Sequence, residues 1–249
     1  MNILFRAVRH FIDFFYPCVC LVCGEKINLN YKINFDKSKI ETNPYIVSTE
    51  FCCAKCKSQV TFAGNKYEIV LDIISNYNEY NFAITNAISL FKNTADMPII
   101  NLIYGLKYKG FISIGLEYGK WLADVLVAEN MINYDYITPV PIHPARRRER
   151  GYNQSDFIAI GINKILNNKI AFDLLKRTKY TSSQTQLSQT ERMKNMINVF
   201  VLNKKYDVNK KKILLVDDVL TTGATLNNCA LTLLENGAKQ VDVATLLKS

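Results

Sequence analysis

Two adjacent acidic residues near the end of the chain are followed closely by a loop of small and hydroxyl-bearing residues. The stretch reads ILLVDDVLTTGAT, and its two acids are Asp217 and Asp218. The apolar run before them predicts a buried parallel strand, and open α/β sheets bind ligands at the carboxyl ends of such strands. The loop residues that follow the acids are Thr221, Thr222, Gly223, Ala224 and Thr225.

This loop is expected to open a helix, where free backbone N–H groups and the positive end of the helix dipole bind phosphate. The threonine hydroxyls add hydrogen-bond donors, and Gly223 allows a ligand to approach the backbone closely. The two carboxylates repel a phosphate, so they suit the hydroxyls of a sugar, or a Mg²⁺ ion held by those hydroxyls. The order of residues therefore predicts a pocket for ribose 5-phosphate.

Two other kinds of domain carry related sequences. An acidic pair after an apolar strand is typical of response-regulator receiver domains, where it lies near the start of the domain. Only 31 residues follow Asp218 (249 − 218), which are too few for that fold. A Walker loop requires a lysine after its glycines, and the segment TTGATLN has none. Both alternatives are excluded.

The N-terminal part of the chain gathers its cysteines in two clusters, PCVCLVCGEK and FCCAKCKSQV. Each cluster contains a C-x-x-C pair, Cys20 with Cys23 and Cys53 with Cys56. One such pair is also typical of redox motifs, but two pairs can supply the four thiolates of a tetrahedral Zn²⁺ ion. We therefore predict one structural zinc ion per chain.

The other cysteines are Cys18, Cys52 and Cys229. Either of the first two could replace a zinc ligand if the register slips, whereas Cys229 lies in a predicted helix and is expected to be a buried apolar thiol. A reduced segment without metal is the alternative to the zinc site. The polar insert of residues 24–52 is longer than most ribbon loops. Because the chain carries no export signal, thiols and metal ligands are favoured over disulfides, and a cytoplasmic location is expected.

Composition favours a globular protein with anionic partners. The chain of 249 residues has 49% hydrophobic and 21% charged residues, with 31 Lys and Arg against 22 Asp and Glu. The resulting net charge of +9 favours phosphates, nucleotides or nucleic acid, although a general bias toward lysine and asparagine is the alternative explanation. No apolar stretch reaches the ~20 residues of a transmembrane helix. The N-terminal segment MNILFRAVRHFIDFFYP is predicted to be a helix packed on its own protein, with peripheral membrane contact as the alternative.

The rest of the chain alternates predicted helices and strands, which indicates a parallel α/β sheet. Helical patterns cover residues 82–91, 97–129, 155–167 (with Ser155 as N-cap) and 225–238 (closed by Gly237), and strands are expected in 134–143, 211–216 and 240–247. We expect two units, residues 1–66 with the N-terminal helix and zinc ribbon and residues 67–249 with the sheet.

Four stretches of the sequence resemble known protein families. The stretch ILLVDDVLTTGAT is similar to the phosphoribosyl pyrophosphate signature of type I phosphoribosyltransferases. Three further stretches, LIYGLKYKG, TPVPIHPARRRERGYNQSDFIA and KRTKYTSSQTQLSQTERMKNMINVF, resemble the ComF family, which is linked to competence and DNA uptake. The resemblance implies a type I phosphoribosyltransferase-like parallel sheet flanked by helices, with a small N-terminal zinc-ribbon domain. One difference is that many relatives carry additional cysteine pairs.

The resemblance also implies roles for particular residues. Asp217 and Asp218 would bind ribose hydroxyls and metal, and residues 221–225 would bind the 5-phosphate. Residues 139–143 would form the pyrophosphate loop, and the segment around residues 184–192 would be a mobile hood that closes over the site. The chemistry expected of such a pocket is displacement of pyrophosphate at the anomeric carbon by a nitrogen nucleophile, assisted by Mg²⁺.

Basic residues beside these motifs are candidates for binding pyrophosphate or the backbone of single-stranded DNA. They are Lys107, Arg146, Arg147, Arg148, Arg150 and Arg192. For the arginine run, a solvated charged turn is the ordinary interpretation. The ordinary interpretation of the segment GLKYKG places Tyr108 in the core and Lys107 on the surface. His143 has no neighbouring His or Cys and is expected to be a packed or loop residue rather than a metal ligand.

Three functions follow. The favoured one is a DNA-uptake factor that handles incoming single strands in the cytoplasm, with single-stranded DNA and DNA-uptake proteins as candidate partners. It would use a phosphoribosyl pyrophosphate pocket for binding or chemistry. The second is a nucleotide-salvage or amine phosphoribosyltransferase. The third is a non-catalytic zinc-ribbon adaptor protein. The sequence identifies neither the acceptor substrate nor a general base, so it does not decide whether the protein is an enzyme.

Overall fold

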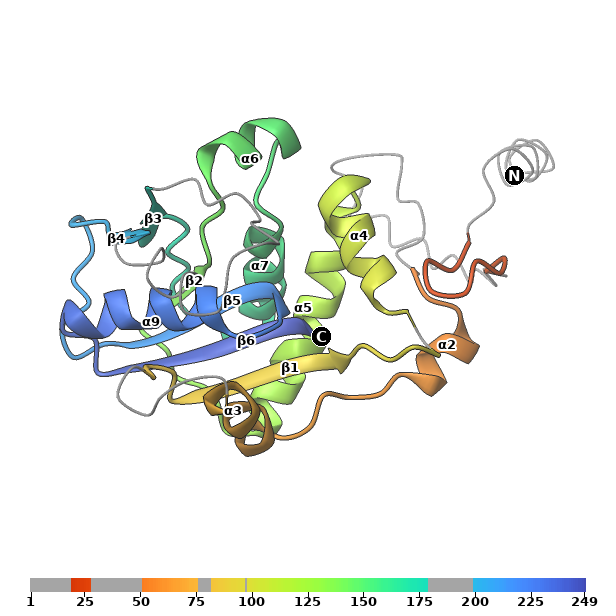
Figure 1. Cartoon of the computed structure of the whole chain (residues 1–249), viewed down its shortest axis with the longest axis horizontal. Helices are drawn as coiled ribbons and strands as arrows, with labels where there is room; N and C mark the ends of the chain where they lie inside the picture. Colours follow the sequence, from red (N-terminus) through yellow and green to blue (C-terminus); the bar gives the residue numbers. More distant parts are fainter. Residues whose placement is uncertain (1–18, 28–50, 76–81, 97, 179–198) are drawn as a thin grey trace, which may run out of the picture.

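The computed structural model in Figure 1 describes residues 19–27, 51–75, 82–96, 98–178 and 199–249. The helices are α2 (Ala54–Gln59), α3 (Lys66–Ile74), α4 (Ile100–Tyr108), α5 (Ile112–Ala128), α6 (Pro144–Arg150), α7 (Gln154–Leu166) and α9 (Ala224–Glu235). The strands are β1 (Asn86–Lys92), β2 (Tyr136–Pro139), β3 (Leu175–Arg177), β4 (Phe200–Leu202), β5 (Lys212–Leu220) and β6 (Gln240–Lys248). None of the helices in these ranges combines the length and hydropathy needed to span a bilayer.

Four parallel strands form the central sheet in the order β1-β6-β5-β2. β5 is bonded on both sides, so that Val216 lies opposite Pro139 of β2 and Ala244 of β6. Its apolar run Ile213–Val216 is buried throughout, as expected for a parallel strand covered on both faces. β3 and β4 pair separately as an antiparallel ribbon.

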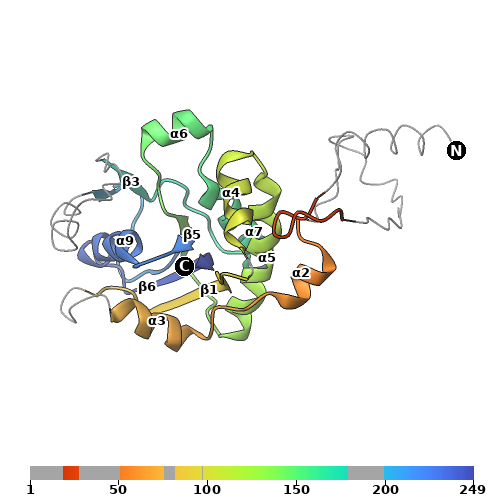
Figure 2. The same ribbon diagram turned by 45° about the vertical axis from the view of Figure 1, so that its right-hand side comes forward.

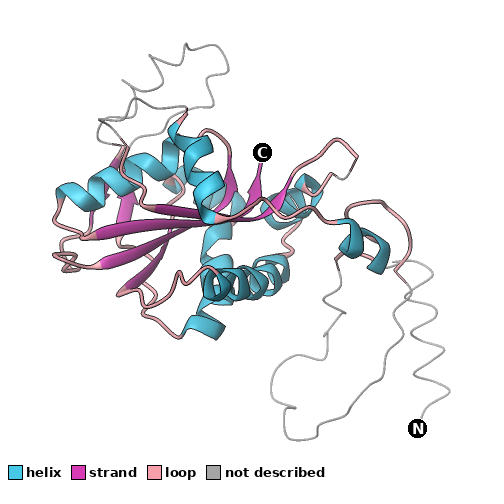
Figure 3. Cartoon of the chain, turned by 90° about the horizontal axis from the view of Figure 1, so that it is seen from below, coloured by secondary structure: helices cyan, strands magenta, loops and turns pink. Residues whose placement is uncertain are grey.

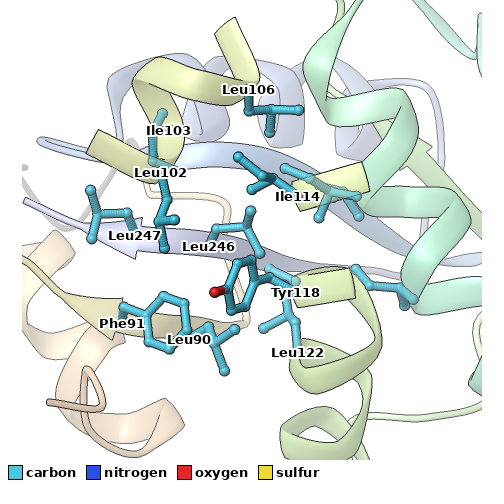
Figure 4. Packing of buried hydrophobic residues seen from close by; sticks show 14 of the residues in the cluster. Leu90, Phe91, Leu102, Ile103, Leu106, Ile114, Tyr118, Leu122, Leu246 and Leu247 are labelled. Atoms are coloured by element: carbon cyan, nitrogen blue, oxygen red, sulfur yellow. The ribbon is translucent and has the colours of Figure 1, made fainter. Parts of the chain in front are cut away.

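Helices cover both faces of the sheet, as Figure 3 shows. On one face α4, α5 and α7 pack on the side chains of Leu214 and Val216, and on the other face α3 and α9 pack on Ile213 and Leu215. Figure 4 shows side chains of α4 and α5 gathered over β6, with Leu102 close to Leu246 and Leu247. Successive side chains of a strand point to opposite faces, so the alternating residues of the apolar run in β5 meet the two helical layers in turn.

The structure corrects the prediction for residues 82–91. This stretch contains β1, a strand in which residues 87–91 are all buried, and not a helix. A strand that is covered on both faces carries a continuous apolar run, which periodicity alone does not distinguish from a buried helix. The other helices and strands predicted within the described residues are confirmed, and the helical stretch 97–129 is divided into α4 and α5 by a turn at Gly110.

The N-cap of α7 also differs from the prediction. Asn153, and not Ser155, caps the helix, since the Asn153 side chain accepts a hydrogen bond from the backbone N–H of Ser155. The hydroxyl of Ser155 therefore remains for a different partner. In α9, the predicted helix end is confirmed, because Gly237 lies just past the helix and has a φ of 94°.

A close crossing of α5 and α7 fixes the position of α7. A Cβ atom added to Gly119 of α5 would lie 2.5 Å from the carbonyl oxygen of Ile158, and one added to Gly161 of α7 would lie 2.5 Å from that of Leu116. Both distances are shorter than van der Waals contact, so the backbones approach this closely only because both positions are glycine. The start of α7 is thereby held beside the end of β5.

Candidate functional site

The acidic pair lies at the carboxyl end of β5. The strand continues through both acids to Leu220, further than its apolar run alone predicts. Asp218 is only 3% exposed and Asp217 is half-buried. Carboxylates this far from solvent require hydrogen bonds or counter-charges, and each of the two has a different partner.

Asp217 is bonded to the start of α7. The hydroxyl of Ser155 donates a hydrogen bond of 2.9 Å to Asp217 Oδ1, and the same oxygen accepts from the backbone N–H of Asp218 at 2.9 Å. Burial and the neighbouring charge of Asp218 raise the pKa of Asp217 to about 7, against the opposing effects of Lys107 and of these hydrogen bonds. The sequence pattern predicts only a capping role for Ser155 and gives no sign of this contact.

Asp218 is paired with α4. The ammonium of Lys107 lies 2.9 Å from Asp218 Oδ1, and the two side chains are 24% and 5% exposed. The second oxygen, Asp218 Oδ2, is buried and has no hydrogen-bond partner among the described residues. A buried acceptor without a donor is costly, so this oxygen is available to a donor brought by a ligand, such as a sugar hydroxyl, or to a cation.

The loop after β5 forms a small open hollow. Asp217, Val219 and the residues 221–226 line about 300 Å³ of space that opens to solvent. The loop leads into α9, whose N-cap is Gly223 and carries no side-chain cap. The predicted order of acids, hydroxyl-rich loop and helix N-terminus is therefore present, and Asp217, the loop and the first residues of α9 line one hollow. At this end of a 12-residue helix the dipole favours negative charge.

Gly223 is required at its position for two reasons. Its φ is 77°, a left-handed conformation that other residues adopt only with strain, and a Cβ atom there would lie 2.6 Å from Cγ2 of Ile73. Ile73 belongs to α3 and is almost completely buried. The packing of α3 thus constrains the backbone of the loop 221–225, a contribution that the sequence pattern does not predict.

The segment predicted as the pyrophosphate loop, residues 139–143, lies beside the acids. The backbone N–H of Val140 bonds to the carbonyl oxygen of Val216 at 2.8 Å, and the Asn153 side chain donates to the carbonyl oxygen of Val140 at 3.0 Å. His143 caps α6, since its Nδ1 accepts from the backbone N–H of Ala145 at 3.1 Å. It is thus a loop residue, as predicted.

The arginine run forms the short helix α6, which rises beside α4 in Figure 1. Arg146, Arg147 and Arg148 are exposed, although Arg147 lies 3.6 Å from Asp156. Arg150 is half-buried, bonds to the side chain of Gln154, and lies 5.3 Å from the ring centre of Tyr108. The run therefore divides into exposed cations and an arginine that ties α6 to α4.

The ordinary interpretation of the segment GLKYKG is wrong. Tyr108 is 64% exposed, whereas Lys107 is directed to the acidic pair. The ring of Tyr108 lies 4.7 Å from that of Tyr104, which is also exposed. A helix presents residues three and four positions apart on the same side, so the two tyrosines share one face of α4. Lys107, one residue before Tyr108, points to a different side.

The four predicted zinc ligands are brought together. The sulfur atoms of Cys20, Cys23, Cys53 and Cys56 all lie within 4.8 Å of one another. The sulfurs of Cys23 and Cys53 are 3.8 Å apart, which matches the edge of a tetrahedron with Zn–S bonds of about 2.3 Å. Each pair also forms the turn expected of a zinc knuckle, because the N–H of Cys23 bonds to the sulfur of Cys20 and that of Cys56 to the sulfur of Cys53. The residues present therefore fit a Zn²⁺ ion.

The thiols differ in how readily they ionise. Burial acts against ionisation of Cys20, but the backbone N–H groups of Cys23, Cys53 and Val22 outweigh it and lower its pKa to about 6. Cys52 is buried outside the four-sulfur cluster, and burial raises its pKa to about 12. Cys229 is fully buried in α9, which confirms that it is an apolar core thiol, and burial raises its pKa well above the ordinary value.

Several predicted features lie outside the described residues. They are the N-terminal helix, Cys18, most of the insert 24–52, the hood around residues 184–192 and Arg192. In the sequence, β3 precedes the predicted hood and β4 follows it. The two strands are paired, and next to them the backbone N–H of Thr178 bonds to the carbonyl oxygen of Val199 at 2.9 Å. The division into units 1–66 and 67–249 stays a prediction.

Comparison with known proteins decides the family. The phosphoribosyl transferase domain matches residues 155–249, which hold α7, β5, α9 and β6. The chain is 35% identical over 114 residues to Competence protein F of Haemophilus influenzae, covering 45% of this chain and 50% of that protein. It is 33% identical over 156 residues to the DNA utilization protein YhgH of Escherichia coli strain K12, covering 61% of this chain and 68% of that protein. The chain belongs to the ComF family.

This ComF protein spans half the length of the Haemophilus relative and about two thirds of the Escherichia one. The predicted phosphoribosyltransferase-like fold, with a parallel sheet flanked by helices, is confirmed by the domain match together with the observed sheet. Among solved structures, glutamine phosphoribosylpyrophosphate amidotransferase from B. subtilis is 24% identical with a TM-score of 0.37, covering 54% of this chain and 27% of that chain. Since one fold hosts many activities, the function has to be argued from the site.

Proposed function

We propose that this ComF protein binds phosphoribosyl pyrophosphate at the carboxyl end of β5 and acts in the cytoplasm in the uptake of DNA. One observation supports the ligand most strongly. Asp217 and the loop 221–225 line the same hollow, which also includes the first residues of α9, and Asp218 follows Asp217 directly on β5. A ligand that carries hydroxyls at one end and a phosphate at the other matches this arrangement of charge.

The acids are assigned to the pentose and the loop to the 5-phosphate. Asp218 Oδ2 is a buried acceptor without a donor, and a ribose hydroxyl would supply that donor. Carboxylate oxygens are also ligands that Mg²⁺ accepts, so Asp217 and Asp218 would hold the ion that accompanies the pyrophosphate group. When bound, Mg²⁺ neutralises negative charge on the pyrophosphate.

The DNA part of the proposal depends on charge and on the relatives. The arginines at 146–148 of α6 and the rings of Tyr104 and Tyr108 on α4 are exposed, and Arg150 of α6 lies against the ring of Tyr108. Cations together with stacking rings are typical of surfaces that bind single strands. The relatives carry the names Competence protein F and DNA utilization protein. Single-stranded DNA and DNA-uptake proteins are therefore the partners that we propose.

A paired binding and transformation experiment tests the proposal. Changing both acids, Asp217→Asn and Asp218→Asn, should weaken phosphoribosyl pyrophosphate binding by at least about tenfold, because each neutral amide loses a charge-assisted hydrogen bond. Asp124→Asn is the matched control, since Asp124 is exposed in the middle of α5. Binding is measured by calorimetry, and transformation frequency is measured in cells that carry each variant.

The outcomes separate the three functions that the sequence suggests. Loss of both binding and transformation supports a role of the pocket in DNA uptake. Pyrophosphate release that depends on an added base or amine indicates a salvage-type transferase, in which a nitrogen atom replaces pyrophosphate at the anomeric carbon. Normal transformation without ligand binding leaves the adaptor function and contradicts our proposal.

A further inference from the structure

α4 stands between the cysteine cluster and the acidic pocket and contacts both. Figure 2 shows residues 19–27 beside α4, on the side away from β5. A Cβ atom added to Gly105 of α4 would lie 3.1 Å from Cδ1 of Leu21, so the leucine side chain already lies against the helix backbone at this point. Leu21 is flanked by the zinc ligands Cys20 and Cys23 in sequence. The first knuckle is thus placed directly on α4.

The second knuckle reaches the same helix end. The backbone N–H of Leu21 bonds to the carbonyl oxygen of Phe51 at 2.9 Å, which joins the two cysteine segments. The ring of Phe51 lies 6.0 Å from that of Phe111, in the turn between α4 and α5. Cys52 and Cys56 belong to the same apolar core as three residues of α4, namely Leu102, Ile103 and Leu106. Both knuckles therefore cover the outer side of this helix.

On its inner side, α4 supplies contacts to the pocket. Lys107 pairs with Asp218 at 2.9 Å, and the carbonyl oxygen of Leu106 accepts a hydrogen bond from the hydroxyl of Tyr152. Tyr152 precedes Ser155 by three residues, and Ser155 donates to Asp217. Each acid is thus tied to a helix end, and the two helix ends are tied to each other through Tyr152.

We propose that metal occupancy of the four cysteines controls the affinity of the acidic pocket through α4. With Zn²⁺ bound, the two knuckles are held at a fixed separation, and Leu21 and Phe51 keep α4 in place. Without metal, the knuckles lose the bonds by which the ion holds them together, and the outer side of α4 loses part of its cover. The Lys107–Asp218 pair then loosens and the pocket is less well ordered for its ligand. Two distinct sites joined by one shared element are the requirement for such coupling.

The inference deepens the proposed function, since it names a regulator of the same pocket. It is tested on the full chain, prepared with Zn²⁺ and after removal of the metal by a chelator. Hydrogen exchange of the α4 amides and calorimetric binding of phosphoribosyl pyrophosphate are measured on both preparations. Removal of Zn²⁺ should speed exchange in α4 and weaken binding by at least about fivefold, and adding Zn²⁺ back should restore both.

A variant separates the coupling from a general loss of structure. Leu21→Ala removes the contact with Gly105 but keeps all four cysteines, so it should retain its metal while its pocket affinity no longer responds to Zn²⁺. Val19→Ala is the matched control, because Val19 is an exposed apolar residue of the same segment and should respond as the natural chain does. Equal exchange in α4 with and without metal would overturn the inference. Failure of the metal-loaded chain to bind phosphoribosyl pyrophosphate would instead overturn the proposed function, and the exchange measurement would still decide on the coupling.

Discussion

The ammonium of Lys107 lies 2.9 Å from the carboxylate of Asp218 and connects the end of α4 to the end of β5. Asp218 is buried on a central strand, where an unpaired carboxylate is strongly unfavourable. Lys107 meets this requirement from a helix that packs on the sheet through Leu102 and Leu106. The pair thus places a cation at the edge of a pocket that we assign to an anionic ligand.

Loss of this cation should destabilise the chain. Lys107→Met keeps most of the length of the side chain but leaves Asp218 without its counter-charge, and we expect a loss of about 2 kcal/mol in the free energy of unfolding. Lys109→Met, at an exposed position two residues further on, should change stability by less than about 0.5 kcal/mol. Chemical denaturation measures both variants.

A double variant tests whether the effect belongs to the pair. With Asp218→Asn in the background, Lys107→Met should destabilise much less, because no charge is then left unpaired. Additive effects of the two changes would contradict the pairing.

Binding of phosphoribosyl pyrophosphate should depend on pH through Asp217. The pKa of this carboxyl is raised to about 7, and both a sugar hydroxyl and Mg²⁺ bind the ionised form. Affinity should therefore fall as pH decreases below about 7, since one pH unit lower only about a tenth of the molecules carry the carboxylate. Calorimetric titrations between pH 6 and 8 measure this profile.

Ser155→Ala should move the profile to higher pH. The Ser155 hydroxyl donates to the ionised carboxylate, so its removal raises the pKa of Asp217 further. Thr232→Ala is the control, because Thr232 donates within α9, to the carbonyl oxygen of Asn228. An unchanged midpoint in Ser155→Ala would show that Asp217 does not govern the titration.

Stability of the free protein should carry the opposite dependence. Because the folded-state pKa of Asp217 is above its ordinary value of 3.8, the folded state binds more protons between about pH 4 and pH 7. The contribution of Asp217 to stability therefore falls as pH rises through this window. Asp217→Asn removes this part of the pH dependence, and denaturant unfolding at several pH values measures it.

Gly223→Ala should disrupt the loop 221–225, which is predicted to bind the 5-phosphate. The new methyl group would both require a left-handed backbone conformation and meet Ile73 at 2.6 Å, at a total cost of about 2–4 kcal/mol. Gly151→Ala is the control, since Gly151 has a similar φ of 86° but nothing within 4 Å of the added atom. It should lose only about 1–2 kcal/mol from strain. Equal losses in thermal unfolding would show that the packing of α3 does not constrain the loop.

Cys53→Ser should abolish stoichiometric zinc binding. The natural chain is expected to hold about one zinc ion, and the variant has lost one of four thiolate ligands. Cys229→Ala should keep the metal, because Cys229 is buried in α9 and is not part of the four-sulfur cluster. Metal analysis of the purified proteins measures this difference, and a natural chain purified without zinc but fully able to bind phosphoribosyl pyrophosphate would contradict the metal-centred part of the account.

The sequence allowed the local features of the site to be predicted better than its tertiary contacts. The strand, the hydroxyl-rich loop and the helix form one contiguous stretch, and the cysteine pairs have a spacing that is typical of metal sites. In contrast, the partners Ser155 and Lys107 come from helices far away in the chain, and periodicity places a residue on a face without saying which element it meets. The helix predicted at residues 82–91 failed for a similar reason, because burial on both faces hides the alternation of a strand.

The most direct test of the account is a crystal structure of the chain with phosphoribosyl pyrophosphate and Mg²⁺. We predict density for the 5-phosphate at the backbone N–H groups of residues 222–225, with the ribose hydroxyls within hydrogen-bond distance of Asp217 or Asp218. An empty pocket at saturating ligand, or a ligand bound elsewhere on the chain, would contradict the central claim.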